Sequence, residues 1–163
     1  MLKNILSGSS CAKCRICCIF DNYDLWETPV VSDELYERLT KEYPDTEYLP
    51  KGKSRIFKCI PDVVNGEELF ICPMLDHSTG CRLGDDKPFD CRIWPYRIME
   101  LGGEQVITIA SICPEMYSKP LSQLVEELER NGLADRIFAE AEKNPDIIKP
   151  YESGYPVLKV KNV

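Results

Sequence analysis

The chain contains very little of what enzymes usually use for acid–base or nucleotide chemistry. It has a single histidine, His77, among 163 residues. A glycine-rich phosphate loop, a dinucleotide fingerprint and a Ser–His–Asp arrangement are all missing from the sequence. Acid–base catalysis would depend on carboxylates or lysines, and no such pair is evident. The sequence therefore leaves open whether the chain is an enzyme, and turns attention to residues that need no neighbouring acid or base.

Positive charge and long apolar runs are also scarce. The 20 Lys and Arg residues are outnumbered by 27 Asp and Glu residues, which gives a net charge of -7. Since phosphate affinity comes chiefly from Lys and Arg, we expect no nucleic-acid partner. No stretch approaches the ~20 apolar residues of a membrane-spanning helix, and residues 1–10 lack the apolar core of a signal peptide. We therefore expect a cytoplasmic protein with no membrane partner.

The remaining composition is typical of a globular protein and favours one compact domain. We expect a single cysteine-cluster domain over residues 1–163, with its core in 11–143 and a C-terminal extension in 144–163. Periodic segments predict the α+β fold class, with two β-hairpins and with helices after the first cysteine run and near the C-terminus.

The helix after the first cysteine run is predicted to begin at a capping residue, Ser32, and to end before Pro44. Acidic residues directly after Ser32 suit the positive end of that helix. Near the C-terminus, apolar residues at helical spacing predict one helix in 121–132 and another in 133–143.

The sequence also predicts five strands, in 55–64, 67–71, 96–101, 105–112 and 155–161. The first two are joined by Asn65-Gly66, which is the strongest short signal for a hairpin. The next two turn at Gly102-Gly103 and form the second hairpin, and the last is expected at a sheet edge.

Cysteine, in contrast, is abundant. The nine cysteines are Cys11, Cys14, Cys17, Cys18, Cys59, Cys72, Cys81, Cys91 and Cys113. Four of them lie within residues 11–18. Because cytosolic thiols are kept reduced, this pattern favours metal binding or catalysis over disulfides. An odd number would also leave one cysteine outside any closed disulfide framework.

The first cysteine run contains two C-x2-C steps in series, Cys11 to Cys14 and Cys14 to Cys17. Clustered thiolates select zinc, copper(I) or iron–sulfur units, and one such step lets two sulfurs reach one metal from a tight turn. The run matches the first three ligands of the bacterial ferredoxin run C-x2-C-x2-C-x3-C-P, but Asp21 takes the fourth position. Asp21 also interrupts the radical-SAM spacing C-x3-C-x2-C. A missing ligand must therefore come from elsewhere in the chain.

Cys17 and Cys18 are neighbours, and neighbouring side chains usually point in different directions. We expect their sulfurs to serve different metals or different faces of one cluster. The eight cysteines besides Cys59 suffice for two four-thiolate sites, and one site is the minimum. All are expected on loops at the ends of strands and helices.

Two longer patterns include these cysteines. The first reads Cys11-Ala-Lys-Cys14-Arg-Ile-Cys17-Cys18, and the second runs from Cys72-Pro73-Met74-Leu75-Asp76 through Cys81 to Cys91-Arg92-Ile93-Trp94-Pro95. Together they resemble the YkgJ-like cysteine-cluster family, which is described as a zinc- or iron-chelating domain. Its motifs are C-x2-C-G-x-C-C and C-P-x-L-D followed by C-x-I-Y-x-x-R-P-x-x-C-R-x-F-P. Cys113-Pro114 fits a later cysteine of the family, so the resemblance covers 11–113.

The chain departs from these motifs at Arg15, where the family has Gly, at Gly84, where it has an aromatic residue, and at Lys87, where it has Arg. No cysteine of the motifs is lost. Spacing and resemblance together predict a pool of eight metal ligands: Cys11, Cys14, Cys17, Cys18, Cys72, Cys81, Cys91 and Cys113.

Three other residues are assigned by their positions. Cys59 lies outside both motifs and within a predicted strand, so we assign it to the core. His77 is expected in a solvated loop rather than on a metal. Arg92 follows a candidate ligand and is our candidate cofactor-binding residue, where it could hydrogen-bond cluster sulfur; pairing with a nearby Asp is the alternative.

Three functions remain open from the sequence. The first is an iron–sulfur protein, with a 4Fe–4S cluster favoured, that acts in electron transfer or as a redox or metal-handling accessory of a partner protein. The second is a zinc-binding interaction module with one or more four-thiolate sites. The third is a thiol redox enzyme or sensor, although few residues before Cys11 could supply the βαβ context of a thioredoxin-like motif.

Overall fold

The computed structural model describes residues 2, 6, 8–21, 27–64 and 66–161. The chain forms two compact units, Met1–Arg92 (unit 1) and Ile93–Val163 (unit 2). The described residues combine helices with several small sheets, which confirms the predicted α+β class. In this described part of the chain, no helix is both long enough and apolar enough to cross a membrane.

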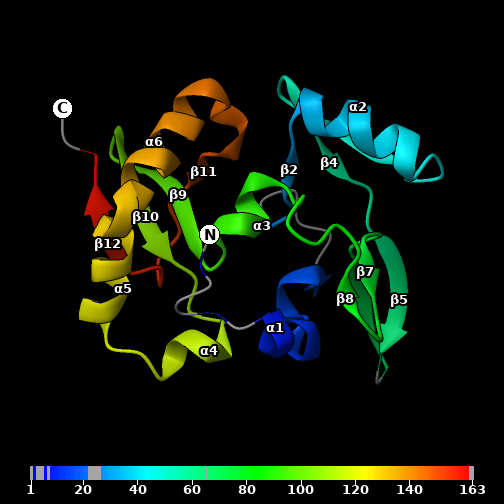
Figure 1. Cartoon of the computed structure of the whole chain (residues 1–163), viewed down its shortest axis with the longest axis horizontal. Coiled ribbons are helices and arrows are strands. Elements are labelled where there is room, and N and C mark those ends of the chain that lie inside the picture. The colour runs from blue at the N-terminus through cyan, green and yellow to red at the C-terminus, as the bar shows by residue number, and fades with distance from the viewer. Residues whose placement is uncertain (1, 3–5, 7, 22–26, 65, 162–163) are drawn as a thin grey trace. The chain divides into compact units, whose positions relative to one another are not determined.

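Unit 1 combines short helices with short strands (Figure 1). Its helices are α1 (Gly8–Cys14), the 3-10 helix η1 (Ile16–Cys18), α2 (Asp33–Glu42) and α3 (Phe89–Ile93), whose last residue already belongs to unit 2. Its strands are β1 (Ile19–Phe20), β2 (Val30–Val31), β3 (Tyr48–Lys51), β4 (Ser54–Phe57), β5 (Ile60–Val64), β6 (Glu67–Ile71), β7 (Leu75–Asp76) and β8 (Gly80–Cys81).

Helix α2 forms where the sequence predicts it. Ser32 is its N-cap, and the Ser32 hydroxyl accepts a hydrogen bond from the Leu35 N–H at 3.4 Å. Asp33 in the first turn suits the positive end of the helix. The helix packs against β4 and fully buries Leu39. It ends two residues before Pro44, because proline restricts the residue before it and cannot donate a helical hydrogen bond.

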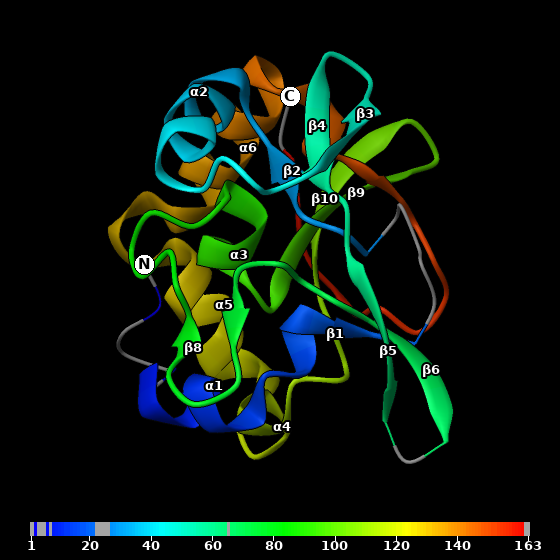
Figure 2. The same ribbon diagram turned by 90° about the vertical axis from the view of Figure 1, so that its right-hand side faces the viewer.

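The predicted hairpin at Asn65-Gly66 is formed by β5 and β6. Val64 pairs with Glu67, and Ile60 pairs with Ile71 at the other end, so the two strands keep one antiparallel register throughout. Asn65 itself lies outside the described residues. On the other side of β6, β1 adds a third antiparallel strand, which gives the sheet order β1-β6-β5 (Figure 2).

The prediction of one strand over 55–64 is wrong, because the structure divides it between two sheets. Its first part is β4, in the sheet β2-β4-β3, and its second part is β5. Lys58 and Cys59 connect the two parts, and the Lys58 N–H donates to the Glu47 carbonyl at 2.9 Å. The local pattern favours extended backbone over the whole range, whereas the break is imposed by the strands on either side.

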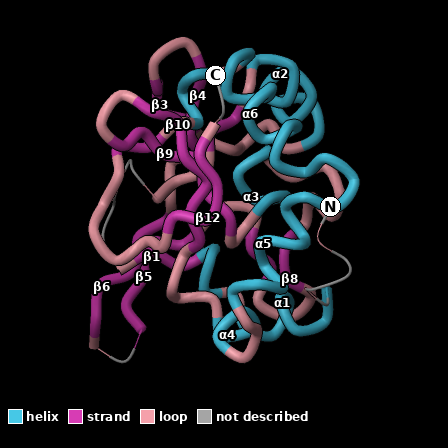
Figure 3. The backbone as a smooth tube through the Cα atoms, turned by 90° about the vertical axis from the view of Figure 1, so that its left-hand side faces the viewer, coloured by secondary structure: helices cyan, strands magenta, loops and turns pink. Residues whose placement is uncertain are grey.

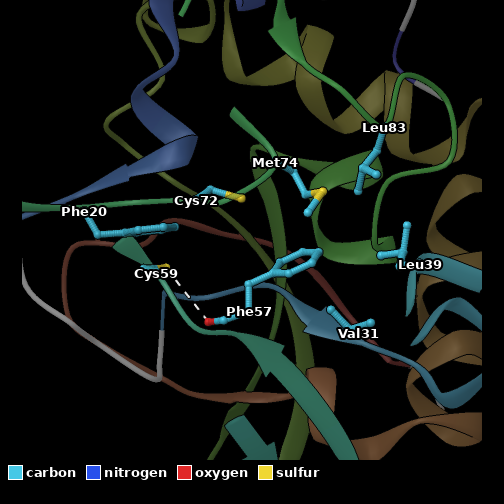
Figure 4. Close-up of a cluster of buried hydrophobic side chains, with 8 residues drawn as sticks. All are labelled: Phe20, Val31, Leu39, Phe57, Cys59, Cys72, Met74 and Leu83. Atoms are coloured by element: carbon cyan, nitrogen blue, oxygen red, sulfur yellow. Dashed lines mark hydrogen bonds between the residues drawn. The ribbon is translucent and has the colours of Figure 1, made fainter. Parts of the chain in front are cut away.

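The core of unit 1 contains two of the cysteines. Its buried side chains are Phe20, Val31, Leu39, Phe57, Cys59, Cys72, Met74 and Leu83 (Figure 4). Cys18 and Cys81 are partly buried and pack against this cluster. Cysteines from both sequence motifs are therefore positioned by the same apolar core.

Unit 2 is built around a four-stranded sheet of order β11-β9-β10-β12, three strands of which are labelled in Figure 3. Its strands are β9 (Tyr96–Leu101), β10 (Glu104–Ile109), β11 (Lys149–Pro150) and β12 (Val157–Val160). Its helices are α4 (Pro114–Tyr117), α5 (Leu121–Glu129), η2 (Arg130–Gly132), α6 (Leu133–Lys143) and η3 (Pro145–Ile147). The second hairpin, both C-terminal helices and the edge strand β12 are confirmed, although β10 ends at Ile109 rather than at residue 112.

Candidate metal centre

The first cysteine motif reverses direction between two helical segments. Cys11 and Cys14 lie in α1, and Cys17 and Cys18 lie in η1, so the expectation that these cysteines occupy loops is wrong. Arg15 between them has a φ of 58°, and it is the one non-glycine residue in the described ranges with a positive φ. The Arg15 N–H donates to the Cys11 carbonyl at 3.0 Å. This left-handed residue therefore ends α1 and starts the second half of the motif in a new direction.

The side of unit 1 that carries α1 is held against the second motif by two contacts. The Arg15 guanidinium donates to the His77 carbonyl at 2.6 Å, and the His77 side chain is exposed in the turn between β7 and β8. A Cβ atom at Gly80 would lie 3.1 Å from both Cα and Cβ of Ala12. Helix α1 thus packs directly on the backbone of β8, whose second residue is Cys81.

Cys72 connects the two motifs through its backbone. The Cys72 N–H donates to the Cys18 carbonyl at 2.9 Å, and the Cys72 carbonyl accepts from the Leu75 N–H at 2.9 Å. Leu75 in turn is the strand partner of Cys81. The Cys72 side chain is 8% exposed. Cys72 is therefore hydrogen-bonded through its backbone to the last residue of the first motif. Its other backbone partner, Leu75, pairs with Cys81, the next cysteine of the second motif.

The thiols of unit 1 lie close enough to influence one another's ionisation. Burial, with smaller contributions from the neighbouring thiols of Cys59, Cys81 and Cys17, raises the pKa of Cys72 from its ordinary value of 9.0 to about 12. Burial also raises the pKa of Cys91 well above its ordinary value, again with contributions from other cysteines, which are Cys72, Cys17 and Cys81. Repulsion between thiolates weakens with distance, so these cysteines lie in the same part of unit 1.

The side chains of Cys17 and Cys18 interact with each other. A hydrogen bond with the Cys18 side chain, followed by burial and by the charge of Cys18, raises the pKa of Cys17 strongly. Lys87 acts in the opposite direction and lowers the pKa of Cys17. The two neighbouring thiols are therefore close to each other, within the tight turn of η1. Lys87, which the sequence analysis did not select as a functional residue, is a cation close to that site.

Arg92 lies on the surface of α3 and contacts an aromatic ring. Its guanidinium carbon is 5.5 Å from the centroid of the Phe89 ring, and its side chain is exposed. Cys91 on the same helix is half-buried. The preceding residue, Asp90, is buried and accepts a hydrogen bond from the Val30 N–H at 3.0 Å. Asp90 therefore fixes α3 to β2, and so helps to set the position of Cys91.

Cys59 and Cys113 are both buried, at 5% and 6% exposure. Cys113 is the N-cap of α4 in unit 2, so the site is described here from the cysteines of unit 1. Cys59 lies in the core, as predicted, but between two strands rather than within one. It also neighbours Cys72, which the sequence analysis missed. The sequence contains a signal for this proximity. A two-residue turn at Asn65-Gly66 pairs residue 64 with 67 and residue 60 with 71, so residues 59 and 72 follow directly beyond the last pair.

All nine cysteines are present as thiols. Within the ranges that the structure describes, no group of three or more His, Cys, Asp or Glu side chains is arranged so that it could hold a metal ion. No family model, curated protein or solved structure matches this chain. A function can therefore be argued only from the residues of the chain and their arrangement.

Proposed function

We propose that unit 1 binds metal through thiolates contributed by both cysteine motifs. The observation that carries this proposal is the position of Cys72, whose N–H donates to the Cys18 carbonyl at 2.9 Å and whose carbonyl accepts from the strand partner of Cys81. Motifs separated by more than fifty residues in the sequence thus meet at one buried cysteine. If Cys72 had a purely structural role, cysteines would not be needed beside both of its backbone partners, namely Cys18 on one side and Cys81 on the other.

The donor set fits a soft metal or an iron–sulfur unit, because thiolates select such metals. The side chains would have to turn toward a common point, and a change between staggered rotamers moves a cysteine sulfur by about 3 Å. The thiols of Cys17, Cys72 and Cys91 have raised pKa values, so their ionised forms are disfavoured without metal. A bound cation would favour the ionised forms. Metal binding in unit 1 would therefore deprotonate thiols that the metal-free site keeps neutral.

An iron–sulfur cluster is the first candidate, because the two C-x2-C steps match three ligands of a ferredoxin run and the second motif can supply the rest. When bound, such a cluster supplies reversible one-electron chemistry without nearby acids or bases. The chain's own part is to hold the thiolates, to keep water from them with the apolar side chains of the unit 1 core, and to place Lys87 near Cys17. The activity proposed is electron transfer, or a redox or metal-handling step with a protein partner in the cytoplasm.

Purification of the full chain without oxygen, followed by absorption spectroscopy and analysis of iron, sulfide and zinc, tests this proposal. Iron and sulfide in a brown protein would support the cluster. Zinc in a colourless protein would support thiolate metal binding and exclude the cluster as the resident group. Metal-free protein with titratable thiols, unable to take up either metal afterwards, would contradict the proposal and leave thiol redox chemistry.

A further inference from the structure

At one end of the sheet β1-β6-β5, a cysteine directly flanks each strand: Cys18 precedes β1, Cys72 follows β6 and Cys59 precedes β5. Ile19 pairs with Ile71, and the Cys72 N–H donates to the Cys18 carbonyl at 2.9 Å, so Cys18 lies opposite Cys72. Directly opposite residues of antiparallel strands place their side chains on the same face of the sheet. Cys18 ends η1 and Cys72 directly follows β6, so these two cysteines lie side by side at this end of the sheet.

On the other side of β6, the same arrangement continues to Cys59. Ile60 pairs with Ile71 in the last pair of the ladder, and Cys59 and Cys72 are the next residue of each chain segment beyond that pair. Because the Cys72 N–H is directed to Cys18, the Cys59–Cys72 position is not hydrogen-bonded. Such positions are the closer kind in an antiparallel ladder, with Cα atoms about 4.5 Å apart. We call Cys18, Cys72 and Cys59 the thiol row.

Burial shows which way the thiol row faces. Phe20, two residues along β1 from Cys18, is buried in the same apolar cluster as Cys59 and Cys72 (Figure 4). Ile60, the neighbour of Cys59, points to the other face and is 54% exposed. Cys59 and Cys72 both belong to the cluster of packed, buried side chains in unit 1. Cys59 thus faces the thiols of the proposed metal site, although neither sequence motif includes it.

The spacing of the row suits one metal ion. Two thiolates that share a tetrahedral ion, each about 2.3 Å from it, lie about 3.8 Å apart. Cβ atoms at directly opposite strand positions are about 4.5–5.5 Å apart, so rotation of two adjacent thiols closes that distance without moving the backbone. The Cys59 thiol donates a weak hydrogen bond, 3.9 Å long, to the Phe57 carbonyl.

We propose that Cys59 is a metal ligand and binds the same metal ion as Cys72, which rests on the thiolate metal site proposed above. Two thiolates on one ion fit a single zinc or iron ion, or one iron of a two-iron cluster. They do not fit a four-iron cluster held by four cysteines, since each iron then takes one thiolate. The inference therefore narrows the metal group from the 4Fe–4S type that the sequence favours to a one- or two-metal site.

Reduced, metal-free full-length protein loaded with cadmium-113 tests this directly, because scalar coupling crosses a cadmium–sulfur bond. The result expected is one cadmium resonance coupled to the β-protons of both Cys59 and Cys72. Coupling to Cys72 and other cysteines without Cys59 would overturn this inference and leave the proposed function intact. Cadmium coupled to no cysteine would overturn both.

A pair of variants gives an independent measure by competition titration with zinc and a chelator. Cys59→Ala removes the thiol, whereas Ile71→Val removes one buried methyl group from the opposite face of the same sheet and serves as the matched control. We expect Cys59→Ala to weaken zinc binding by about tenfold or more, since even loss of an outer partner of a ligand costs that much. Equal affinities for the two variants would overturn the inference. The cadmium experiment on the unaltered chain decides the question even if Cys59→Ala does not fold.

Discussion

Arg15 has a backbone conformation that ordinarily belongs to glycine. Its φ of 58° places it in the left-handed region, where a side chain with a Cβ costs roughly 1–2 kcal/mol. Glycine, which has no Cβ, adopts this conformation without that cost. In this chain the guanidinium partly offsets the cost by donating to the His77 carbonyl at 2.6 Å.

The Arg15→Gly variant should therefore be more stable than Arg15→Ala, although glycine usually lowers stability through its larger entropy in the unfolded chain. Both lose the hydrogen bond to His77, but only Gly relieves the left-handed strain, so we expect Arg15→Gly to be more stable by about 1 kcal/mol. Urea unfolding of the two variants under identical metal loading measures the difference. If Arg15→Ala is as stable as Arg15→Gly or more so, the left-handed backbone at this residue is wrong.

Asp76 stabilises the turn between β7 and β8 through its carboxylate. It accepts hydrogen bonds from the Ser78 hydroxyl and from the N–H groups of Ser78 and Thr79, at 2.5, 2.9 and 2.8 Å. These bonds, with the Ser78 side chain contributing most, lower the pKa of Asp76 below its ordinary value of 3.8. A carboxylate with a lowered pKa stabilises the folded state above that ordinary value, and this stabilisation is lost as the pH falls below it.

Asp76→Ala should accordingly lower the free energy of unfolding at neutral pH. We expect the gap between the wild type and the variant to shrink steadily once the pH falls below about 3.8, because the wild-type carboxylate is then also becoming protonated. Urea unfolding of both proteins, metal-free and reduced, across neutral to acid pH gives the comparison. A gap that stays constant over this range would contradict the role given to the carboxylate.

The contact between α1 and β8 leaves little room for a side chain at Gly80. A Cβ at Gly80 would meet the Cα and Cβ of Ala12 at 3.1 Å, and Gly80 also has a φ of 91°. Gly66 has a similar φ of 85°, but nothing lies within 4 Å of its hypothetical Cβ. The two glycines therefore separate the effect of backbone strain from the effect of displacing α1.

Gly80→Ala should reduce both stability and metal affinity, whereas Gly66→Ala should reduce stability alone. Overpacking of α1 against β8 typically costs 1–3 kcal/mol, to be added to the strain that both variants share. It would also move Cys11 and Cys14 away from Cys81. Unfolding and zinc titration of the two variants provide the measurement, and equal metal affinities would show that the packing of α1 on β8 does not position the site.

The elements of this chain were predictable where a local signal fixes them. Ser32 and Pro44 bound α2, and the Asn65-Gly66 turn gives the register of β5 and β6. Local signals fail at residues 58 and 59, where nothing in the sequence marks the change from one sheet to another. They fail again at α1 and η1, because helix formation within the cysteine run depends on a left-handed Arg15 that propensity disfavours.

The sequence predicted which cysteines belong to the candidate site, but not which side chains lie close together. Sequence spacing selected the cysteines of both motifs, and the structure brings Cys17, Cys72, Cys81 and Cys91 near one another in unit 1. Spacing could not show that Lys87 lies near Cys17, since that proximity arises from tertiary folding. The proximity of Cys59 to Cys72 could have been deduced, because the hairpin register pairs the adjacent residues Ile60 and Ile71.

At the scale of the whole molecule, the described cysteine neighbourhood belongs to unit 1, and unit 2 has a sheet and helices with their own buried core. In the described part of unit 2, residues from β9, β10, α5 and α6 are buried, including Ile98, Ile107, Leu128 and Ile137. Metal binding coupled to folding should therefore act unequally on the two units.

Removal of metal by a chelator should consequently lower amide protection in unit 1 much more than in unit 2. Hydrogen exchange of the full chain, read by mass spectrometry with and without chelator, is the appropriate measurement. We expect at least about a tenfold faster exchange in β5, β6 and α1, with little change in β9, β10 and α6. Equal acceleration in both units would contradict a site built from unit 1.

X-ray absorption at the edge of the resident metal, in full-length protein purified without oxygen, tests the central claim most directly. That claim is that thiolates from both motifs bind one metal group in unit 1. The predicted result is a first shell of sulfur, at about 2.3 Å if the metal is zinc, that loses sulfur in both Cys17→Ala and Cys72→Ala. A shell dominated by nitrogen or oxygen, or one left unchanged by either substitution, would contradict it.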